Sequence, residues 1–492
     1  MSLRPLFRST LAYSLNTLIA PLFSMVLTPL YTRVLTPEDF GALGLIRSLG
    51  MIISVFGMLG MITAMSVLLY KQSDEESRLR LLSTALWLGI ICSTLLMVVA
   101  LFVVEPLALI WLGDLRFAPM IFVYLLNLPF GVIYTLQTGA FRLRQEAFKA
   151  TAVGLAQIVL LAVGNLVLVV WLRAGLMGAL AAEMCTYVGL SLLCLLLAPE
   201  YVLAAPRALL QGWSVEPVTR RLLLAGVPLI PMGLANWALN YIDRPLLLQM
   251  GIGLDQIGIY DIAAKLASLL TLLSIPFQQA WIPFALSIQE QSSAAQTYAR
   301  TLIWYLAGML GMVLGLSLFA REIIMVFTTP MYLPAYRYVW LLGSAAPIIG
   351  SQIILTTGLY ITGKTAHLAW TTMVGAAVNI GLNLLLVPVL GVAGAAIATP
   401  LGYLCGPIAA VIVAQRYYAV PYQWRPVFLL LTIQMALVVA GLWFSQETSV
   451  LSVGVRLLFL LMYPVMLIGL GMISLDDLAR GQQLIERYLR WG

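Results

Sequence analysis

The sequence predicts an all-α polytopic membrane protein, and three observations support this fold class. Hydrophobic residues make up 62% of the 492 residues, and charged residues only 10%. The mean hydropathy of +0.98 lies far above that of soluble domains. The apolar runs are long enough, at roughly 20 residues, to favour membrane-spanning helices over the shorter alternating strands of a barrel.

The apolar runs predict about 14 transmembrane helices. Reading from one polar break to the next places them near residues 10–31, 40–69, 81–104, 119–140, 150–172, 175–198, 222–249, 256–286, 301–319, 338–361, 367–387, 391–414, 427–445 and 451–473. The first run is too long for a signal-peptide core, so we interpret it as a permanent helix. Pro228, Pro231, Pro276 and Pro283 are expected kink points.

Basic residues predict the orientation of these helices. With a cytoplasmic N-terminus, the cytoplasmic segments carry 18 of the 27 Lys and Arg residues. The opposite loops carry five, which are Arg33, Arg116, Arg173, Arg321 and Arg337. The positive-inside rule therefore predicts that both termini are cytoplasmic. The net charge of +7 is explained by this topology, and no basic stripe with interleaved aromatic residues indicates nucleic-acid binding.

An internal repeat predicts two lobes. Gly175–Ala182 matches Gly391–Ala398 at an offset of 216, and Phe40–Ala42 lies over Ile257–Ile259 at an offset of 217. Six helices separate the copies, so the lobes should share one orientation and enclose a cleft. The predicted parts are an N-terminal six-helix lobe, a cytoplasmic linker, a C-terminal six-helix lobe, two additional helices and a cytoplasmic amphipathic tail, at residues 1–198, 199–221, 222–414, 415–473 and 474–492.

Polar residues within the apolar helices are the candidate site residues, because an ionisable group in lipid usually faces a cavity or a partner. The ionisable candidates are Arg47, Glu183, Asp243, Arg244, Asp261 and Lys265. Asn236 and Asn240 share a helix face with Asp243. Arg47 and Lys265 fall at nearly equivalent positions of the repeat, and two cations facing a cleft would suit a diphosphate.

Structural interpretations of these charges stay open at this point. Asp261 and Lys265 are four residues apart and could simply neutralise each other. Arg456 lies near the start of its helix and is expected to snorkel to the surface, as Arg244 could do. Glu183 has no sequence partner, and it is interpreted either as a protonated buried acid or as a proton-coupling group.

Enzymatic function is not expected. No soluble domain interrupts the helices, and His367, the single histidine, has no neighbouring His or Cys for a metal site or a catalytic triad. No Walker-type loop indicates ATP binding. We therefore expect no catalytic residue, no metal and no cofactor. The four cysteines lie in apolar stretches, which is typical of packing residues.

Several phrases of the sequence resemble those of a known family. They are RVLTPEDFGALG at 33–44, NYIDR at 240–244, GIYDIAAK at 258–265, LYITGK at 359–364, NLLLVP at 383–388 and GVAGAAIAT at 391–399. Together they resemble polysaccharide-biosynthesis flippases of the O-antigen type, in the multidrug/oligosaccharidyl-lipid/polysaccharide exporter superfamily. The additional helices 13 and 14 depart from the twelve-helix members and resemble those of peptidoglycan-precursor flippases.

The resemblance implies a transporter in the bacterial inner membrane that turns a polyprenyl-diphosphate-linked oligosaccharide from the inner to the outer leaflet. In the family, cations line the cleft between two lobes, and this role carries over to Arg47, Arg244 and Lys265. The implied partners are the lipid-linked glycan and membrane lipids, with polysaccharide polymerase and glycosyltransferases as candidates. The alternative is a cation-coupled multidrug extruder of the same superfamily, which would prefer an acidic cavity.

Overall fold

The computed structural model describes residues 27–210, 214, 216–444 and 449–472. Within these ranges, 13 helical segments are long and apolar enough to cross a membrane, at Pro37–Leu69, Glu75–Phe102, Leu115–Leu143, Ala147–Trp171, Gly175–Leu197, Glu216–Tyr241, Leu254–Ser287, Ala294–Phe327, Pro330–Ile361, His367–Leu390, Val392–Tyr417, Trp424–Phe444 and Val450–Gly469. They coincide with the second to fourteenth predicted spans, so the predicted fold class is confirmed. The first predicted span lies outside the described residues except at its last turn, and the predicted tail lies wholly outside them.

The chain forms two compact units, residues 1–261 with 375–398 and residues 262–374 with 399–492. The boundary falls within three helices, which are α15 (Leu254–Ser287), α20 (His367–Leu390) and α21 (Val392–Tyr417). The other helices of the first unit are α2 (Thr28–Val34), α3 (Pro37–Met58), α4 (Met61–Leu69), α5 (Glu75–Phe102), α6 (Val104–Leu112), η1 (Leu115–Phe117), α7 (Ala118–Leu125), α8 (Leu128–Leu143), α9 (Ala147–Asn165), η2 (Leu166–Trp171), α10 (Gly175–Leu197), α11 (Glu200–Leu210), α12 (Glu216–Gly226), η3 (Val227–Leu229), α13 (Ile230–Tyr241) and α14 (Asp243–Gln249).

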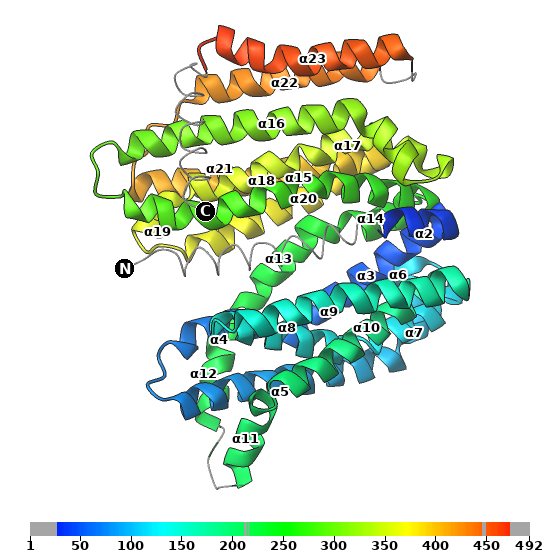
Figure 1. Ribbon diagram of the computed structural model, residues 1–492, viewed down its shortest axis with the longest axis vertical. Coiled ribbons are helices and arrows are strands. Elements are labelled where there is room, and N and C mark those ends of the chain that lie inside the picture. Colours follow the sequence, from blue (N-terminus) through cyan, green and yellow to red (C-terminus); the bar gives the residue numbers. More distant parts are fainter. Residues whose placement is uncertain (1–26, 211–213, 215, 445–448, 473–492) are drawn as a thin grey trace. The chain divides into compact units, whose positions relative to one another are not determined.

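In the first unit, α5, α8, α9 and α10 run side by side (Figure 1). Their shared core includes Leu82, Phe141 and Leu190, each no more than 2% exposed. Helix α3 begins with a capping box, in which the backbone N–H of Asp39 donates to the Thr36 hydroxyl and the Asp39 carboxylate accepts from the Thr36 N–H. The cap fixes where the helix carrying Arg47 starts.

Two of the predicted proline kinks coincide with a helix break. Pro228 lies in the short 3-10 turn η3, and Pro231 lies in the first turn of α13, so this span is divided between α12 and α13. Pro276 and Pro283, in contrast, lie inside α15, which continues through both. Neighbouring helices can compensate for the hydrogen bonds that a proline removes, which is why a membrane helix tolerates it.

The predicted repeat is visible in matching local structure. Gly175 and Gly391 start the matched segments with φ angles of +56° and +57°, a conformation that glycine adopts without strain. Asn165 and Asn383, on the preceding helices, are both 0% exposed. Each side-chain amide donates to the backbone oxygen four residues earlier. The two copies of the sequence therefore fold alike at these hairpins, as the repeat predicts.

The predicted linker at 199–221 is largely helical where the structure describes it, because α11 and the start of α12 lie within it. Helix α11 packs on α5, where the Ser83 hydroxyl donates to the backbone oxygen of Val202 at 3.0 Å. The Tyr201 hydroxyl donates to Glu146 Oε1 at 2.6 Å. Burial raises the pKa of Tyr201, which keeps it a donor. The predicted linker therefore packs against the helices of the first unit.

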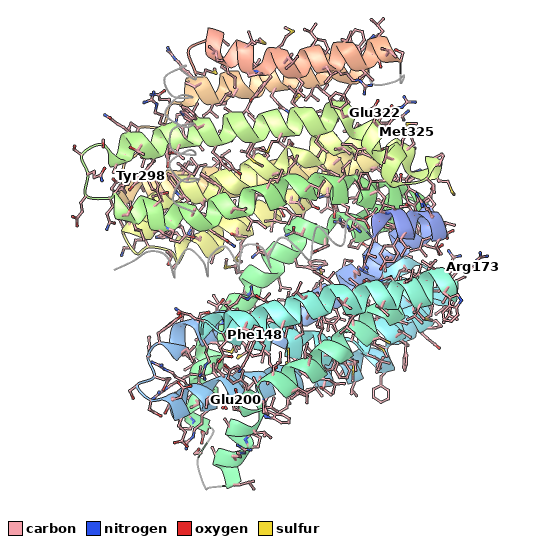
Figure 2. The ribbon with its side chains drawn as sticks, in the orientation of Figure 1. Phe148, Arg173, Glu200, Tyr298, Glu322 and Met325 are labelled. Atoms are coloured by element: carbon pink, nitrogen blue, oxygen red, sulfur yellow. The ribbon has the colours of Figure 1, made fainter. Side chains whose placement is uncertain are left out.

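The other helices of the second unit are α16 (Ala294–Phe327), η4 (Pro330–Ala335), α17 (Tyr336–Gly343), α18 (Ala345–Leu355), α19 (Thr357–Ile361), α22 (Trp424–Phe444) and α23 (Val450–Gly469). Helices α22 and α23, which are the additional pair, pack against α16 (Figure 1). The prediction that Arg456 snorkels to the surface is wrong. Arg456 is 0% exposed on α23 and binds both carboxylate oxygens of Glu322 on α16, at 2.9 and 2.7 Å. Figure 2 labels Glu322 near the C-terminal end of α16.

Candidate functional site

The first part of the candidate site is an ion pair between two helices of the first unit. Arg47 lies in the middle of α3, and its Nη2 donates to Oε1 of Glu183 on α10. The two side chains are 28% and 12% exposed. Glu183, for which the sequence offered no partner, therefore has one, and it lies 136 residues away along the chain.

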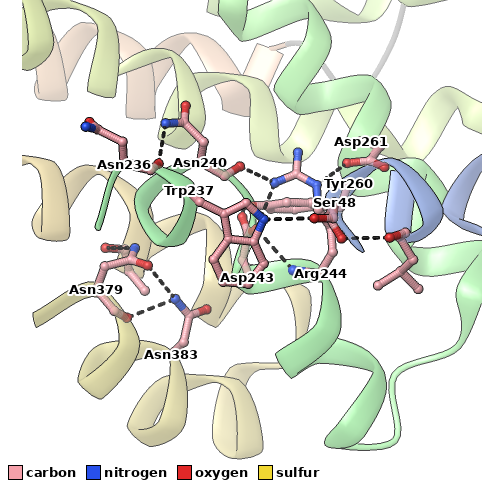
Figure 3. A network of polar contacts seen from close by, with 12 residues as sticks. Ser48, Asn236, Trp237, Asn240, Asp243, Arg244, Tyr260, Asp261, Asn379 and Asn383 are labelled. Carbon is pink, nitrogen blue, oxygen red and sulfur yellow. Dashed lines mark hydrogen bonds and ion pairs between the residues drawn. The ribbon is translucent and has the colours of Figure 1, made fainter. Parts of the chain in front are cut away.

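The second part of the candidate site surrounds Arg244 (Figure 3). Arg244 Nε donates to Asp261 Oδ1 at 2.7 Å, and its Nη1 donates to Asp243 Oδ1 at 2.8 Å. The other oxygen of Asp243 accepts a hydrogen bond from the Tyr260 hydroxyl. All three charged residues are at most 9% exposed. Asp261 therefore pairs with Arg244, which lies 17 residues earlier in the chain.

Helix α3 connects the two parts of the site. A Cβ at Gly44, one turn before Arg47, would overlap the Asp261 carboxylate, so glycine lets this acid lie against α3. Trp237 of α13 also contacts α3, because its Nε1 donates to the backbone oxygen of Ser48 at 2.9 Å. Both ion-pair groups are therefore in contact with the same stretch of α3.

Replacing Trp237 with phenylalanine should destabilise this stretch modestly. The ring would still fill the space, but the indole N–H that donates to Ser48 would be lost, which costs about 1 kcal/mol. The free energy of unfolding, measured by SDS titration in mixed micelles, would test this. No loss of stability would show that the hydrogen bond does not fasten α13 to α3.

Asn236 and Asn240 lie near the Arg244 group (Figure 3). Both are exposed, and each side-chain amide donates to the backbone oxygen four residues earlier on α13. The backbone oxygen of Asn240 also accepts from Arg244 Nη1 at 2.6 Å. Seven of the eight predicted site residues thus lie in the first unit, whereas Lys265 belongs to the second.

Sequence reasoning missed Tyr260, Trp237 and the buried pair Asn379 and Asn383 of α20. Asn379 Nδ2 donates to the backbone oxygen of Ala398 at 3.2 Å, and Asn383 Nδ2 donates to that of Asn379. Their spacing of four residues places both asparagines on one face of an apolar helix, and this pattern could have identified them.

Comparison with known proteins identifies the family. Residues 6–289, more than half of the chain, match the family model described as polysaccharide biosynthesis protein. The chain belongs to this family. The resemblance noted in the sequence is thereby confirmed, and Arg47, Glu183, Arg244 and Asp261 lie within the matched part of this polysaccharide biosynthesis protein. No curated protein sequence matches.

Solved structures with the same fold are membrane transporters. The lipid II flippase MurJ, in an inward closed conformation, is 13% identical with a TM-score of 0.69, and the match covers 93% of this chain and 98% of MurJ. A multidrug resistance MATE family transporter in an inward-facing conformation is 17% identical with a TM-score of 0.68, covering 80% and 93%. A MATE transporter from Vibrio cholerae has a TM-score of 0.57 at 15% identity, covering 84% and 96%. At these identities the similarity shows the fold alone.

Proposed function

We propose that this polysaccharide biosynthesis protein is a flippase that moves a polyprenyl-diphosphate-linked oligosaccharide from the inner to the outer leaflet of the bacterial inner membrane. The observation that carries the proposal is the cluster of ion pairs and amides within apolar helices of a chain that belongs to this family. The mechanism is alternating access of two lobes around a cleft, as the repeat predicts, and the family resemblance implies that cations line this cleft. The excess of basic residues in the predicted cytoplasmic segments supports cytoplasmic termini.

The candidate residues differ in what their surroundings allow them to do. Arg47 is partly exposed and contacts its carboxylate through one nitrogen, so we assign it the diphosphate. Arg244 is held by two carboxylates and almost fully buried, which suits a residue that fixes α14 to α15. The exposed amides of Asn236 and Asn240 offer hydrogen bonds to sugar hydroxyls or phosphate oxygens. Lys265 stays a predicted second ligand of the diphosphate.

A second candidate function is supported by the charge balance. With Glu183 paired to Arg47, the candidate site residues comprise three acids and three cations, so the three cations that the resemblance implies for the cleft are balanced by an equal number of acids. Cationic drugs favour sites with acidic groups, and the fold is shared with multidrug transporters. The family match favours the lipid-linked glycan over a drug.

The two functions are separated by a transport assay with two cargoes. Purified protein in liposomes would receive either a fluorescent undecaprenyl-diphosphate-linked sugar or the cationic dye ethidium. We expect the protein to speed the transfer of the lipid-linked sugar between leaflets at least about tenfold over protein-free liposomes, because its headgroup cannot cross hydrocarbon unaided. Movement of ethidium without transfer of the lipid-linked sugar would contradict the flippase function and support the multidrug extruder.

A further inference from the structure

The contact between Arg47 and Glu183 differs from a structural ion pair elsewhere in the chain. In the second unit, Arg456 is 0% exposed and binds both carboxylate oxygens of Glu322 through two nitrogens. Arg47 is 28% exposed and contacts Glu183 through one nitrogen. A guanidinium has five N–H donors, so contacts with one Glu183 oxygen and with Tyr31 leave capacity for a second anion. The Arg47–Glu183 pair therefore has the form of an exchangeable contact.

The surroundings of Glu183 are polar although the helices are apolar. The hydroxyls of Tyr31, Tyr124 and Tyr187 lie within electrostatic reach of its carboxylate. Asn165, which interacts with Tyr31, is fully buried, and its side-chain oxygen has no hydrogen-bond partner among the residues that the structure describes. Directly after Asn165 the chain forms the π-helical turn η2, and π-helical turns inside α-helices are frequent at functional sites.

We propose that Glu183 is an internal counter-ion that holds Arg47 between transport cycles and takes up a proton when an anionic headgroup displaces it. This inference rests on the proposed function. A diphosphate carries more charge than a carboxylate and can bind the guanidinium through two oxygens, so it competes for Arg47. The released carboxylate is left in a medium of low dielectric constant, where the neutral acid is favoured. The proton comes from water on the side to which the site is open, and it leaves again when the pair re-forms.

The other groups that face Glu183 do not titrate in the same pH range. Arg47 on α3 stays charged, and the tyrosines of α2, α7 and α10 are neutral at physiological pH. Tyr134 of α8, also neutral there, contacts Tyr187. Asp261, which interacts with Arg47, is held by its own arginine. Proton uptake at neutral pH would therefore report on Glu183.

Calorimetry on the purified full-length protein tests the exchange. Farnesyl diphosphate, a soluble diphosphate with a short prenyl chain, is titrated into the protein at about pH 7.5, where its terminal phosphate is already almost fully ionised. Repeating the titration in buffers of different ionisation enthalpy gives the number of protons taken up per ligand. We expect uptake approaching one proton in the wild type and none in Glu183→Gln, with affinity about tenfold higher because the competing carboxylate is gone. Arg47→Gln should lose most of the affinity.

The matched control is Glu76→Gln, which changes an exposed glutamate paired with Arg80 and should keep wild-type affinity and proton uptake. Wild-type binding without proton uptake would overturn the exchange, and this measurement needs no variant that might misfold. Loss of binding in a folded Glu183→Gln protein would overturn it as well. Proton-coupled binding without leaflet transfer would instead overturn the proposed function alone, whereas absence of diphosphate binding would overturn both.

Discussion

Replacing Gly258 with alanine should destabilise the first unit by about 1–3 kcal/mol and impair transport. Gly258 on α15 lies against the start of α3, where an added Cβ would overlap the backbone oxygen of Pro37 and lie 2.9 Å from the backbone nitrogen of Gly41. A Cβ at Gly41 would overlap the Leu254 carbonyl in the same way. Because these atoms belong to the backbone, the helices must separate to admit the methyl group. Unfolding by SDS titration would measure the loss.

The control for this substitution is Gly381→Ala on α20, where an added Cβ meets no atom within 4 Å. Alanine should be neutral there, or stabilising by up to about 1 kcal/mol, because it favours the helix. If both variants unfolded at the wild-type detergent concentration, the close crossing of α3 and α15 would not contribute to stability. The contact joins the glycines that the repeat places at equivalent positions, Gly41 and Gly258.

Replacing Glu322 with alanine should destabilise the second unit by about 3–5 kcal/mol. The change would leave the guanidinium of Arg456 fully buried without its carboxylate. The backbone oxygens of Leu318 and Ser452, which also accept from Arg456, cannot neutralise its charge. The loss would be measured by thermal unfolding, with the cleavage of α22 and α23 by a protease as the signal that these helices have separated from the second unit. The effect should be large because a lone charge among apolar helices is costly.

Two comparisons make this expectation specific to the buried charge. Changing Glu322 and Arg456 together to leucine should restore most of the stability, because no lone charge remains. Glu38→Ala, which breaks the exposed pair with Arg116, should cost less than about 1 kcal/mol. A double leucine variant as unstable as Glu322→Ala would show that packing, and not an uncompensated charge, is responsible.

The helices could be predicted from the sequence because hydropathy and length decide which segments cross a membrane. The largest error was at the predicted span 301–319, which is observed as α16, Ala294–Phe327. The predicted span stopped at charged residues near both ends of the apolar run, but the observed helix continues through these residues. Glu322 lies in this unrecognised extension, which is why the partner of Arg456 was missed.

The site was only partly predictable, because ion pairs between helices leave no periodic signal in the sequence. The spacing of Asn236, Asn240 and Asp243 predicted one helix face, but the structure divides this segment between α13 and α14 and buries Asp243, whereas both asparagines are exposed. The pairing of Arg47 with Glu183 spans 136 residues and depends on tertiary packing. The cationic character expected of the site rested on leaving Glu183 out of the charge count, and the pairing of Glu183 with Arg47 is visible only in the tertiary structure.

The most direct test of the account is the transfer of a fluorescent undecaprenyl-diphosphate-linked sugar between the leaflets of liposomes that contain wild-type protein, Arg47→Gln or Arg78→Gln. Arg78 is a solvent-facing arginine, 43% exposed, and serves as the matched control. We expect wild-type transfer from Arg78→Gln and transfer reduced at least about tenfold in a folded Arg47→Gln protein, because the diphosphate loses one of its two proposed cations. Undiminished transfer by Arg47→Gln would contradict the assignment of the diphosphate to Arg47.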